Sequence, residues 1–376
     1  MVDLTLNTEV LEWAARQVGQ TLDTVARVVT KSEPSFEKVL GGRLTPSQAQ
    51  KFSKETRVPF GLLFLSEPPG SIRQVIPDLR QAPNPLPLSA DFFEVLEDAI
   101  RKQEWFKEHL EHGGTRKLPF VGSFNVSSSP QEVATDIRQK LNLSDLHRSE
   151  CKDQDEYFRL LSSRAEQAGI LVLKSGIVKS NTRRSLSPRE FRGFAISDDI
   201  APLVFINGRD WEIAHVFTLL HEIGHIWLGQ SGVSDFAYKR AKGDIEIFCN
   251  RVASEVLVPE AEFLLKFREN TNLTVLAKHF RVSRLVVARR ALDLKRIEKT
   301  DYDSIASVSA ASDPPAKDSD GGNPYATYPI RNSRRLTSAL VSSALSGETL
   351  LRDAAALLNV RPQTIITLSQ KMKLSG

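Results

Sequence analysis

The stretch Phe217-Thr218-Leu219-Leu220-His221-Glu222-Ile223-Gly224-His225 governs the interpretation of the whole chain. Its two histidines are four residues apart, so a helix would place both imidazoles on one face. Two neutral imidazoles at this spacing can bind zinc, and Glu222 between them is placed to deprotonate a water on the metal. The motif therefore predicts a helix that carries a hydrolytic metal site.

The residues around the motif predict a helix with two distinct faces. An apolar stripe at helical spacing forms a core face, and Thr218 joins His221, Glu222 and His225 on the opposite side. The stripe consists of Ile213, Val216, Phe217, Leu220, Ile223 and Trp227. Because Leu219, Ile226 and Leu228 flank the polar face, we expect it to be sunk in a cleft.

A catalytic zinc site needs a third protein ligand, and Glu246 is the best candidate. It lies on a second predicted helix over residues 244–256, and Asn250 falls four residues later on the same face. Asn250 could hydrogen-bond a ligating imidazole and fix its orientation. Spacing alone leaves three competing carboxylates open, which are Asp235, Asp244 and Glu255.

A family resemblance rests on these residues. The H-E-x-x-H stretch, the segment Ser231-Gly232-Val233-Ser234-Asp235 and the run from Glu246 to Pro259, with its Glu-x-x-Cys-Asn and Leu-Val-Pro phrases, closely resemble the ImmA/IrrE family of zinc metallopeptidases. The resemblance implies that His221, His225 and Glu246 bind Zn²⁺ and that Glu222 is the catalytic carboxylate. The firm similarity covers about residues 190–260. A weaker similarity to longer members, which have an amino-terminal XRE-type helix-turn-helix and a helical tail, spans most of the chain.

Composition predicts a soluble multidomain protein. The chain has 376 residues with 50 basic and 46 acidic side chains, a formal net charge of +4 that favours neither nucleic acid nor an acidic partner. Cys151 and Cys249 are too few for a disulfide framework. The amino terminus lacks a signal-peptide pattern, and no apolar run is long enough to span a membrane. These features predict a cytoplasmic location without membrane association.

Turn signals and apolar periodicity predict an α+β protein, mainly helical, with a zincin-like core of a small sheet and the motif helix. Helical patterns occur at 10–18, 22–29, 36–40 and 47–56, and strand patterns at 169–173, 191–196 and 202–206. The predicted segments are an XRE-like bundle (1–66), a Pro-rich connector (67–90), a helical section (91–168), the peptidase core with a helical extension (169–298), a disordered linker (299–324) and a helical carboxy-terminal domain (325–376).

The group that stabilises the reacting carbonyl oxygen is open. Tyr238 ranks first, and His215 and Arg192 are alternatives, although packing roles for Tyr238 and His215 are the more common reading of such residues. We also expect a substrate peptide to add to an exposed edge of the strand over 191–196.

Nucleic-acid binding is a separate question. Residues 1–70 carry eight basic and eight acidic side chains, and the segment 35–42 offers few side chains that could contact bases, which weakens a DNA role for the bundle. Residues 278–299 carry eight basic and two acidic side chains, and residues 331–376 carry seven and two. Either region could bind phosphates, but a bracing helical pair with a solvated cationic face is favoured for 278–299, and the same caution applies to 331–376.

The leading prediction is a zinc endopeptidase that uses Glu222 as general base. The resemblance implies a transcriptional repressor or antitoxin-like regulator as its protein substrate, in phage and stress responses. The alternative is a DNA-associated transcriptional regulator that uses the peptidase fold as a sensor or scaffold. A zinc hydrolase of a non-peptide amide is a third possibility.

Overall fold

The computed structural model describes residues 3–18, 20–56, 58, 60–66, 68, 88–234, 244–310 and 323–373. The chain divides into two compact units, the smaller formed by residues 1–75 and 86–96 and the larger by residues 76–85 and 97–376. The division falls within the long helix α5 (Ala90–His112). The predicted Pro-rich connector over 67–90 lies almost wholly outside the described residues. Among the described helices, none is long and apolar enough to cross a membrane.

The smaller unit is a helical bundle with a short two-stranded ladder. Its elements are β1 (Leu4–Thr5), α1 (Thr8–Arg16), α2 (Leu22–Val29), α3 (Glu33–Leu40), β2 (Arg43–Leu44), α4 (Pro46–Thr56) and the 3-10 helix η1 (Phe60–Phe64). Asn7 and Thr21 cap α1 and α2 by accepting hydrogen bonds from backbone amides in the first turn. Leu11, Val25 and Phe52 are fully or almost fully buried in the bundle's own core. The four helical patterns in this segment are therefore confirmed, whereas the ladder was not predicted.

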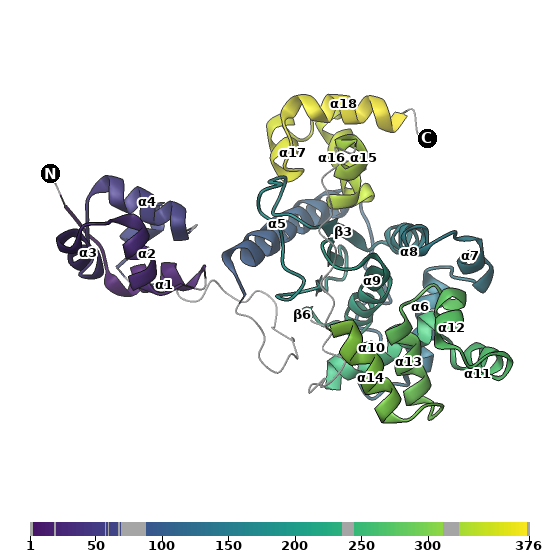
Figure 1. Ribbon diagram of the computed structural model, residues 1–376. Coiled ribbons are helices and arrows are strands. Elements are labelled where there is room, and N and C mark those ends of the chain that lie inside the picture. The colour runs from purple at the N-terminus through teal and green to yellow at the C-terminus, as the bar shows by residue number, and fades with distance from the viewer. Residues whose placement is uncertain are drawn as a thin grey trace. The chain divides into compact units, whose positions relative to one another are not determined.

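The larger unit holds all the remaining elements (Figure 1). They are α6 (Pro130–Lys140), α7 (Asp145–Glu150), α8 (Gln154–Ala168), β3 (Leu171–Ser175), β4 (Gly193–Ile196), β5 (Leu203–Asn207), α9 (Glu212–Trp227), β6 (Gly232–Ser234), α10 (Asp244–Leu257), α11 (Glu260–Glu269), α12 (Leu273–Phe280), α13 (Arg284–Asp293), α14 (Lys299–Ala310), α15 (Pro324–Arg331), α16 (Arg334–Ser346), α17 (Leu351–Leu357) and α18 (Pro362–Lys373).

The sheet of the larger unit has the strand order β3-β5-β4-β6. β3 and β5 run parallel, with Leu171 opposite Leu203, while β4 runs antiparallel to both β5 and β6. All residues of β4 and β5 are buried, as expected for central strands with both faces covered. The three predicted strands are confirmed to within two residues, and β6 is an addition.

The motif helix α9 lies against this sheet and is enclosed by other helices. It contacts β4 and β5 on one side and packs against α8 and α10 on others. One continuous apolar core joins these elements and includes Phe120, whose ring stacks on Trp227 with centroids 4.3 Å apart. The indole nitrogen of Trp227 also donates a hydrogen bond to Asp136 on α6 at 2.7 Å. Helix α9 therefore packs against both the sheet and the neighbouring helices of the larger unit.

The prediction of a disordered linker over 299–324 is wrong for its first part. Residues 299–310 form α14, because Tyr302 and Ala306 pack on Ala288 of α13 and are almost fully buried. The sequence there is rich in Ser and Asp, yet these two apolar side chains, four residues apart, share one helical face. Residues 311–322 lie outside the described residues.

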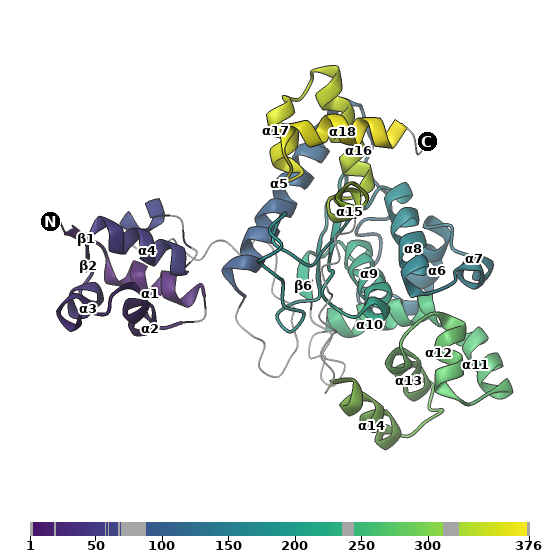
Figure 2. The same ribbon diagram turned by 45° about the horizontal axis from the view of Figure 1, so that its top comes forward.

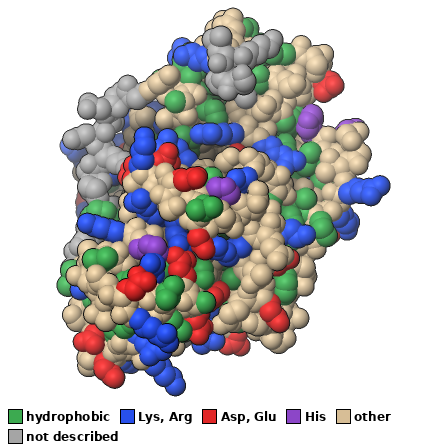
Figure 3. Space-filling model, turned by 90° about the vertical axis from the view of Figure 1, so that its right-hand side faces the viewer, with side chains coloured by type: hydrophobic (Ala, Val, Ile, Leu, Met, Phe, Trp, Pro, Cys, Tyr) green, Lys and Arg blue, Asp and Glu red, His purple; other side chains and the backbone are tan. Residues whose placement is uncertain are grey.

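Two groups of helices extend from the sheet of the larger unit in different directions. Helices α11–α14 form one group and α15–α18 the other, as both ribbon views show (Figures 1 and 2). On the face drawn in Figure 3, basic and acidic side chains are interspersed, in keeping with the formal net charge of +4. Charge on this protein is therefore better judged element by element than from its total.

Candidate metal centre

The helix α9 begins at the exposed Glu212 and then runs through the interior. The Asp210 carboxylate accepts a hydrogen bond from the Trp211 backbone amide at 2.9 Å, just before the first helical turn. Every residue from 215 to 227 is buried, including both histidines of the motif. The expectation of a sunken polar face is therefore confirmed, and burial extends all round the helix.

Three side chains from two helices converge on one point. The Nε2 atoms of His221 and His225 lie 3.1 Å apart. Oε2 of Glu246, on α10, is 3.2 Å from Nε2 of His221, and its Oε1 is 3.1 Å from Nε2 of His225. Among the described residues these three form the group of ligating side chains that could hold a metal ion, and all three are buried.

The triangle has the size that zinc requires. A tetrahedral Zn²⁺ with ligand distances of about 2.0–2.1 Å separates its ligand atoms by roughly 3.3–3.4 Å. The two Nε2 atoms are 3.1 Å apart, and each lies 3.1–3.2 Å from a different oxygen of Glu246. The donor set of two imidazoles and one carboxylate is also that of known catalytic zinc sites. Burying these lone pairs together is unfavourable unless a cation lies among them. The residues present therefore fit a metal ion.

Asn250 lies where it can orient one ligand. Its side-chain oxygen is 3.0 Å from Nδ1 of His221, on the ring edge opposite Nε2. Because an amide oxygen can only accept, Nδ1 carries the proton and Nε2 directs its lone pair toward the point between the three side chains. Such a partner fixes the tautomer and the ring orientation that a metal ligand needs.

Electrostatics favour the protonation states that bind a cation. Burial lowers the pKa of His221 below its ordinary value, so its imidazole is neutral near pH 7. Burial on its own raises the pKa of the Glu246 carboxyl, but His221 and His225 outweigh this effect and hold it at about 2. Neutral imidazoles and an ionised carboxylate are the forms that coordinate a metal.

Glu222 is fully buried and lies directly beneath strand β4. A Cβ atom added at Gly193 would lie 2.8 Å from Oε1 of Glu222 and 3.0 Å from Cγ2 of Thr218. The strand can approach the helix this closely only because residue 193 has no side chain. Gly193 lies in the strand predicted over 191–196, but its role in positioning Glu222 was not recognised; a glycine inside a strand pattern was the available signal.

Two arginines form hydrogen bonds at the carboxy-terminal end of α10, the helix that carries Glu246. Arg138 on α6 donates to the Val256 carbonyl at 3.0 Å, and Arg290 on α13 donates to the Val258 carbonyl at 3.0 Å. Guanidinium groups at a helix carboxy terminus satisfy carbonyls that have no partner within the helix. Arg290 also forms a buried ion pair with Glu255. Sequence reasoning missed these supports because the partners are far apart in the chain.

The competing carboxylates are not brought to the triangle by the described contacts. Glu255 is engaged with Arg290, and Asp244 is exposed at the first residue of α10. Asp235 and Tyr238, the favoured electrophile candidate, lie outside the described residues. The other two electrophile candidates have other partners, since Arg192 pairs with Asp210 at 3.6 Å and buried His215 packs 5.7 Å from the Phe158 ring, centroid to centroid.

The prediction of a free substrate-binding edge on the strand over 191–196 is wrong. β4 pairs with β5 on one side and with β6 on the other, where Gly193 lies opposite Ser234 and Ala195 opposite Gly232. Only three residues form β6, too few to be recognised as a strand by sequence pattern. The edge strand on this side of the sheet is therefore β6, and β4 is an inner strand.

Comparison with known protein families agrees with this geometry. Residues 165–292 match the family model of the IrrE N-terminal-like domain, Peptidase_M78. That match supports a metallopeptidase-like domain and contains every residue of the triangle. Residues 332–371 match a second family model, a domain of unknown function, DUF8813. No curated protein matches the chain. The likeness of residues 1–66 to XRE-type domains stays a prediction, since neither match reaches them.

Proposed function

We propose that the protein is a zinc-dependent endopeptidase. The observation that carries this proposal is the buried triangle of His221, His225 and Glu246, with ligand atoms 3.1–3.2 Å apart, beside the buried carboxylate of Glu222. The match of residues 165–292 to the Peptidase_M78 model supports the same activity. A carboxylate buried beside a potential metal site has little structural use and a clear chemical one.

Each residue has a distinct role in the proposed reaction. A zinc ion held by His221, His225 and Glu246 would lower the pKa of a water and polarise the peptide carbonyl. Glu222 accepts the proton from the attacking water and returns it to the leaving amine. Asn250 holds the His221 ring in the required tautomer. Gly193 lets the Glu222 carboxylate lie under β4.

The substitution Glu222→Gln tests the assignment directly. The amide cannot take the proton, so peptide cleavage should fall about 10²–10⁴-fold while zinc content stays the same. The matched control is Glu212→Gln, the same change at an exposed position of the same helix. Zinc is measured by mass spectrometry of the purified proteins, with His221→Ala as the variant that should lose it. Cleavage retained by Glu222→Gln would exclude Glu222 as the base.

The proposed substrate is a transcriptional repressor or an antitoxin-like regulator. Support comes from the likeness to the ImmA/IrrE family. The experiment is to incubate a lysate of the source organism with the wild type, Glu222→Gln or Glu212→Gln protein and to sequence all new protein amino termini. New termini in a DNA-binding regulator, formed by wild type and Glu212→Gln but not by Glu222→Gln, are expected. New termini confined to other classes of protein would overturn the substrate assignment.

A further inference from the structure

The last helices of the chain form a helix-turn-helix. Helix α17 ends at Leu357, Asn359 takes a left-handed conformation with φ of 54°, and α18 begins at Pro362. Both helices pack on each other and on α16 through buried apolar side chains. These include Leu336, Leu340, Ala354, Ala355, Leu358, Ile365 and Leu368. Proteins use this arrangement to present the second helix to the major groove of DNA.

The outward face of α18 consists of side chains that can contact base edges. Gln363 and Gln370 are exposed, and Thr364 and Thr367 are half-buried between them. Glutamine pairs with adenine through two hydrogen bonds, and threonine contacts bases through its hydroxyl or methyl group. By contrast, the exposed face of α3 in the amino-terminal bundle carries Glu33 and Glu37, whose charges oppose DNA.

In the other basic helical pair, residues 278–299, three of the eight basic side chains serve the fold. In α13, Arg290 is buried against Glu255 and Arg289 pairs with Asp293 at 3.0 Å. Arg281, between α12 and α13, donates to the Lys152 carbonyl at 3.0 Å. The preference for a bracing role of residues 278–299 therefore agrees with the contacts found there.

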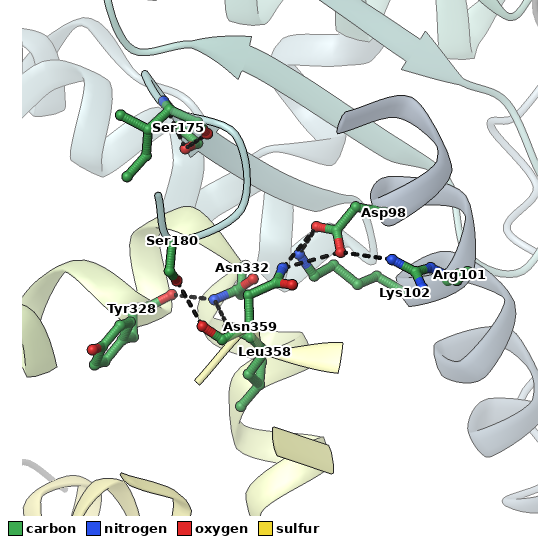
Figure 4. Close-up of polar contacts among 10 residues, drawn as sticks. Asp98, Arg101, Lys102, Ser175, Ser180, Tyr328, Asn332, Leu358 and Asn359 are labelled. Atoms are coloured by element: carbon green, nitrogen blue, oxygen red, sulfur yellow. Dashed lines mark hydrogen bonds and ion pairs between the residues drawn. The ribbon is translucent and has the colours of Figure 1, made fainter. Parts of the chain in front are cut away.

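The turn of the α17–α18 pair is anchored to two other elements (Figure 4). Nδ2 of Asn359 lies 3.0 Å from each carboxylate oxygen of Asp98 on α5. The Asn359 carbonyl accepts a hydrogen bond from the Ser180 hydroxyl at 2.6 Å. Ser180 belongs to the connection between β3 and β4, residues 176–192, of which we name residues 176–189 the basic loop. The turn therefore has a fixed place beside this loop.

The basic loop brings positive charge to the junction. Residues 179–189 carry Lys179, Arg183, Arg184 and Arg189 and no acidic side chain. Arg183 is exposed, as is Arg361 on the turn itself. Arg101 on α5 contributes another largely exposed guanidinium.

Acidic side chains near the junction do not cancel this charge. Asp98 is buried and forms ion pairs with the buried Lys102 and, at 3.3 Å, with Arg101. Asp353 on α17 pairs with Arg352 at 3.3 Å. Glu97 is an exposed acid on the adjacent part of α5. Glu190, directly after the basic loop, is buried, and the exposed Arg183 and Arg361 outnumber Glu97, so the surface attracts polyanions.

We infer that α18 and the basic loop together form a binding surface for double-stranded DNA. Residues of α18 from Gln363 to Gln370 enter the major groove, and Arg361 and Arg183 contact phosphates on its flanks. The surface combines base-reading and phosphate-binding side chains, the two kinds of contact that a specific DNA reader needs. It is separate from the metal triangle and does not depend on peptidase activity.

Fluorescence anisotropy with the full-length protein and a labelled 30-base-pair duplex tests this inference at several salt concentrations. The double variant Arg183→Glu/Arg361→Glu should weaken binding at least about tenfold and lower the salt slope by about 2, one unit for each phosphate contact. The matched control is Lys278→Glu/Arg284→Glu, which reverses two charges on α12 and α13 and should bind like wild type. Glu222→Gln should also bind like wild type.

A second measurement separates DNA reading from general attraction to polyanions. Selection from a pool of randomised duplexes should enrich one sequence for the wild type, and Gln363→Ala/Gln370→Ala should lose that enrichment while non-specific affinity changes less than about twofold. Equal weakening by both charge-reversal pairs would overturn the inference. Heparin or an acidic protein bound as tightly as duplex, without sequence enrichment, would overturn it as well.

Discussion

At the residue scale, strand β4 can lie close to helix α9 because residue 193 is a glycine, whose side chain is a single hydrogen atom. An alanine there would place its Cβ 2.8 Å from Oε1 of Glu222 and 2.9 Å from the Phe205 carbonyl oxygen. The carbonyl belongs to the backbone of β5 and cannot easily move, so the carboxylate must. The position of the Glu222 carboxylate, the proposed base, therefore depends on Gly193 of strand β4.

Gly193→Ala should lower peptide cleavage while the protein stays folded. Displacing Glu222 from the metal site should reduce cleavage at least about tenfold, whereas overpacking should cost about 1–3 kcal/mol in the free energy of unfolding. Zinc content should be unchanged, because Gly193 does not touch the triangle. The measurements are cleavage rate, zinc stoichiometry and urea unfolding. Gly113→Ala is the matched control, since its nearest contact is 3.4 Å; equal loss of cleavage in both variants would contradict the positioning role.

The site residues differ in how far sequence could reveal them. His221 and His225 share one helical face and Glu246 and Asn250 share another, so periodicity predicts each pair, while the meeting of the two faces was implied only by the family resemblance. Arg290 could not be found in this way, because it contacts Glu255 across 35 positions and its partner depends on how α13 folds back on α10. Local spacing predicts ligands on shared helices; contacts between distant elements require the tertiary structure.

At the scale of elements, short strands and helix junctions are where sequence prediction was weakest. β6 has three residues, one of them glycine, and exists because β4 offers it hydrogen-bonding partners. Similarly, the sequence predicted a helical carboxy-terminal domain over 325–376, but not its attachment to α5. That attachment rests on Asn359, which combines a left-handed backbone with a side chain aimed at Asp98.

Asn359→Gly should loosen the attachment without disturbing the turn. Glycine retains the left-handed backbone but removes the contact with Asp98, which should cost about 1–2 kcal/mol because that carboxylate is buried. Asn359→Ala should cost about 1 kcal/mol more through backbone strain. Hydrogen exchange followed by mass spectrometry should become faster in α16–α18 and stay unchanged in α9.

The control for this experiment is Asn142→Gly, the same substitution at another left-handed asparagine, with φ of 48°, next to α6. It should leave exchange in α16–α18 as in wild type. If Asn359→Gly also exchanges like wild type, the contact with Asp98 does not secure the carboxy-terminal helices. A faster exchange in α9 as well would mean that the variant acts on the whole unit rather than on the attachment.

At the scale of the whole molecule, the chain has two units with separate apolar cores. The core of the smaller unit includes Leu11 and Phe52, and that of the larger includes Ile223 and Trp227. Composition and turn signals indicated several units, because a chain of 376 residues exceeds one ordinary core. The division inside α5 could not be predicted, since a continuous helix carries no turn signal at that point.

Metal removal should affect these units unequally. The metal triangle lies entirely in the larger unit, so a bound ion stabilises that unit and not the other. At a free zinc concentration 1,000 times the dissociation constant, the stabilisation is about 4 kcal/mol. Calorimetry of the zinc-loaded protein should show two unfolding transitions, and a chelator should lower one of them by several degrees. The transition of the smaller unit should stay in place.

The His221→Ala variant decides whether the shift reflects this site. Without one imidazole the triangle loses a ligand, so its larger unit should unfold at the chelated wild-type temperature, and further chelator should change nothing. Lys278→Glu, an exposed change in the same unit, should retain the full response to chelator. A chelator-induced shift of equal size in His221→Ala would place the stabilising metal elsewhere. A shift of the smaller unit's transition would show that the two units do not unfold independently.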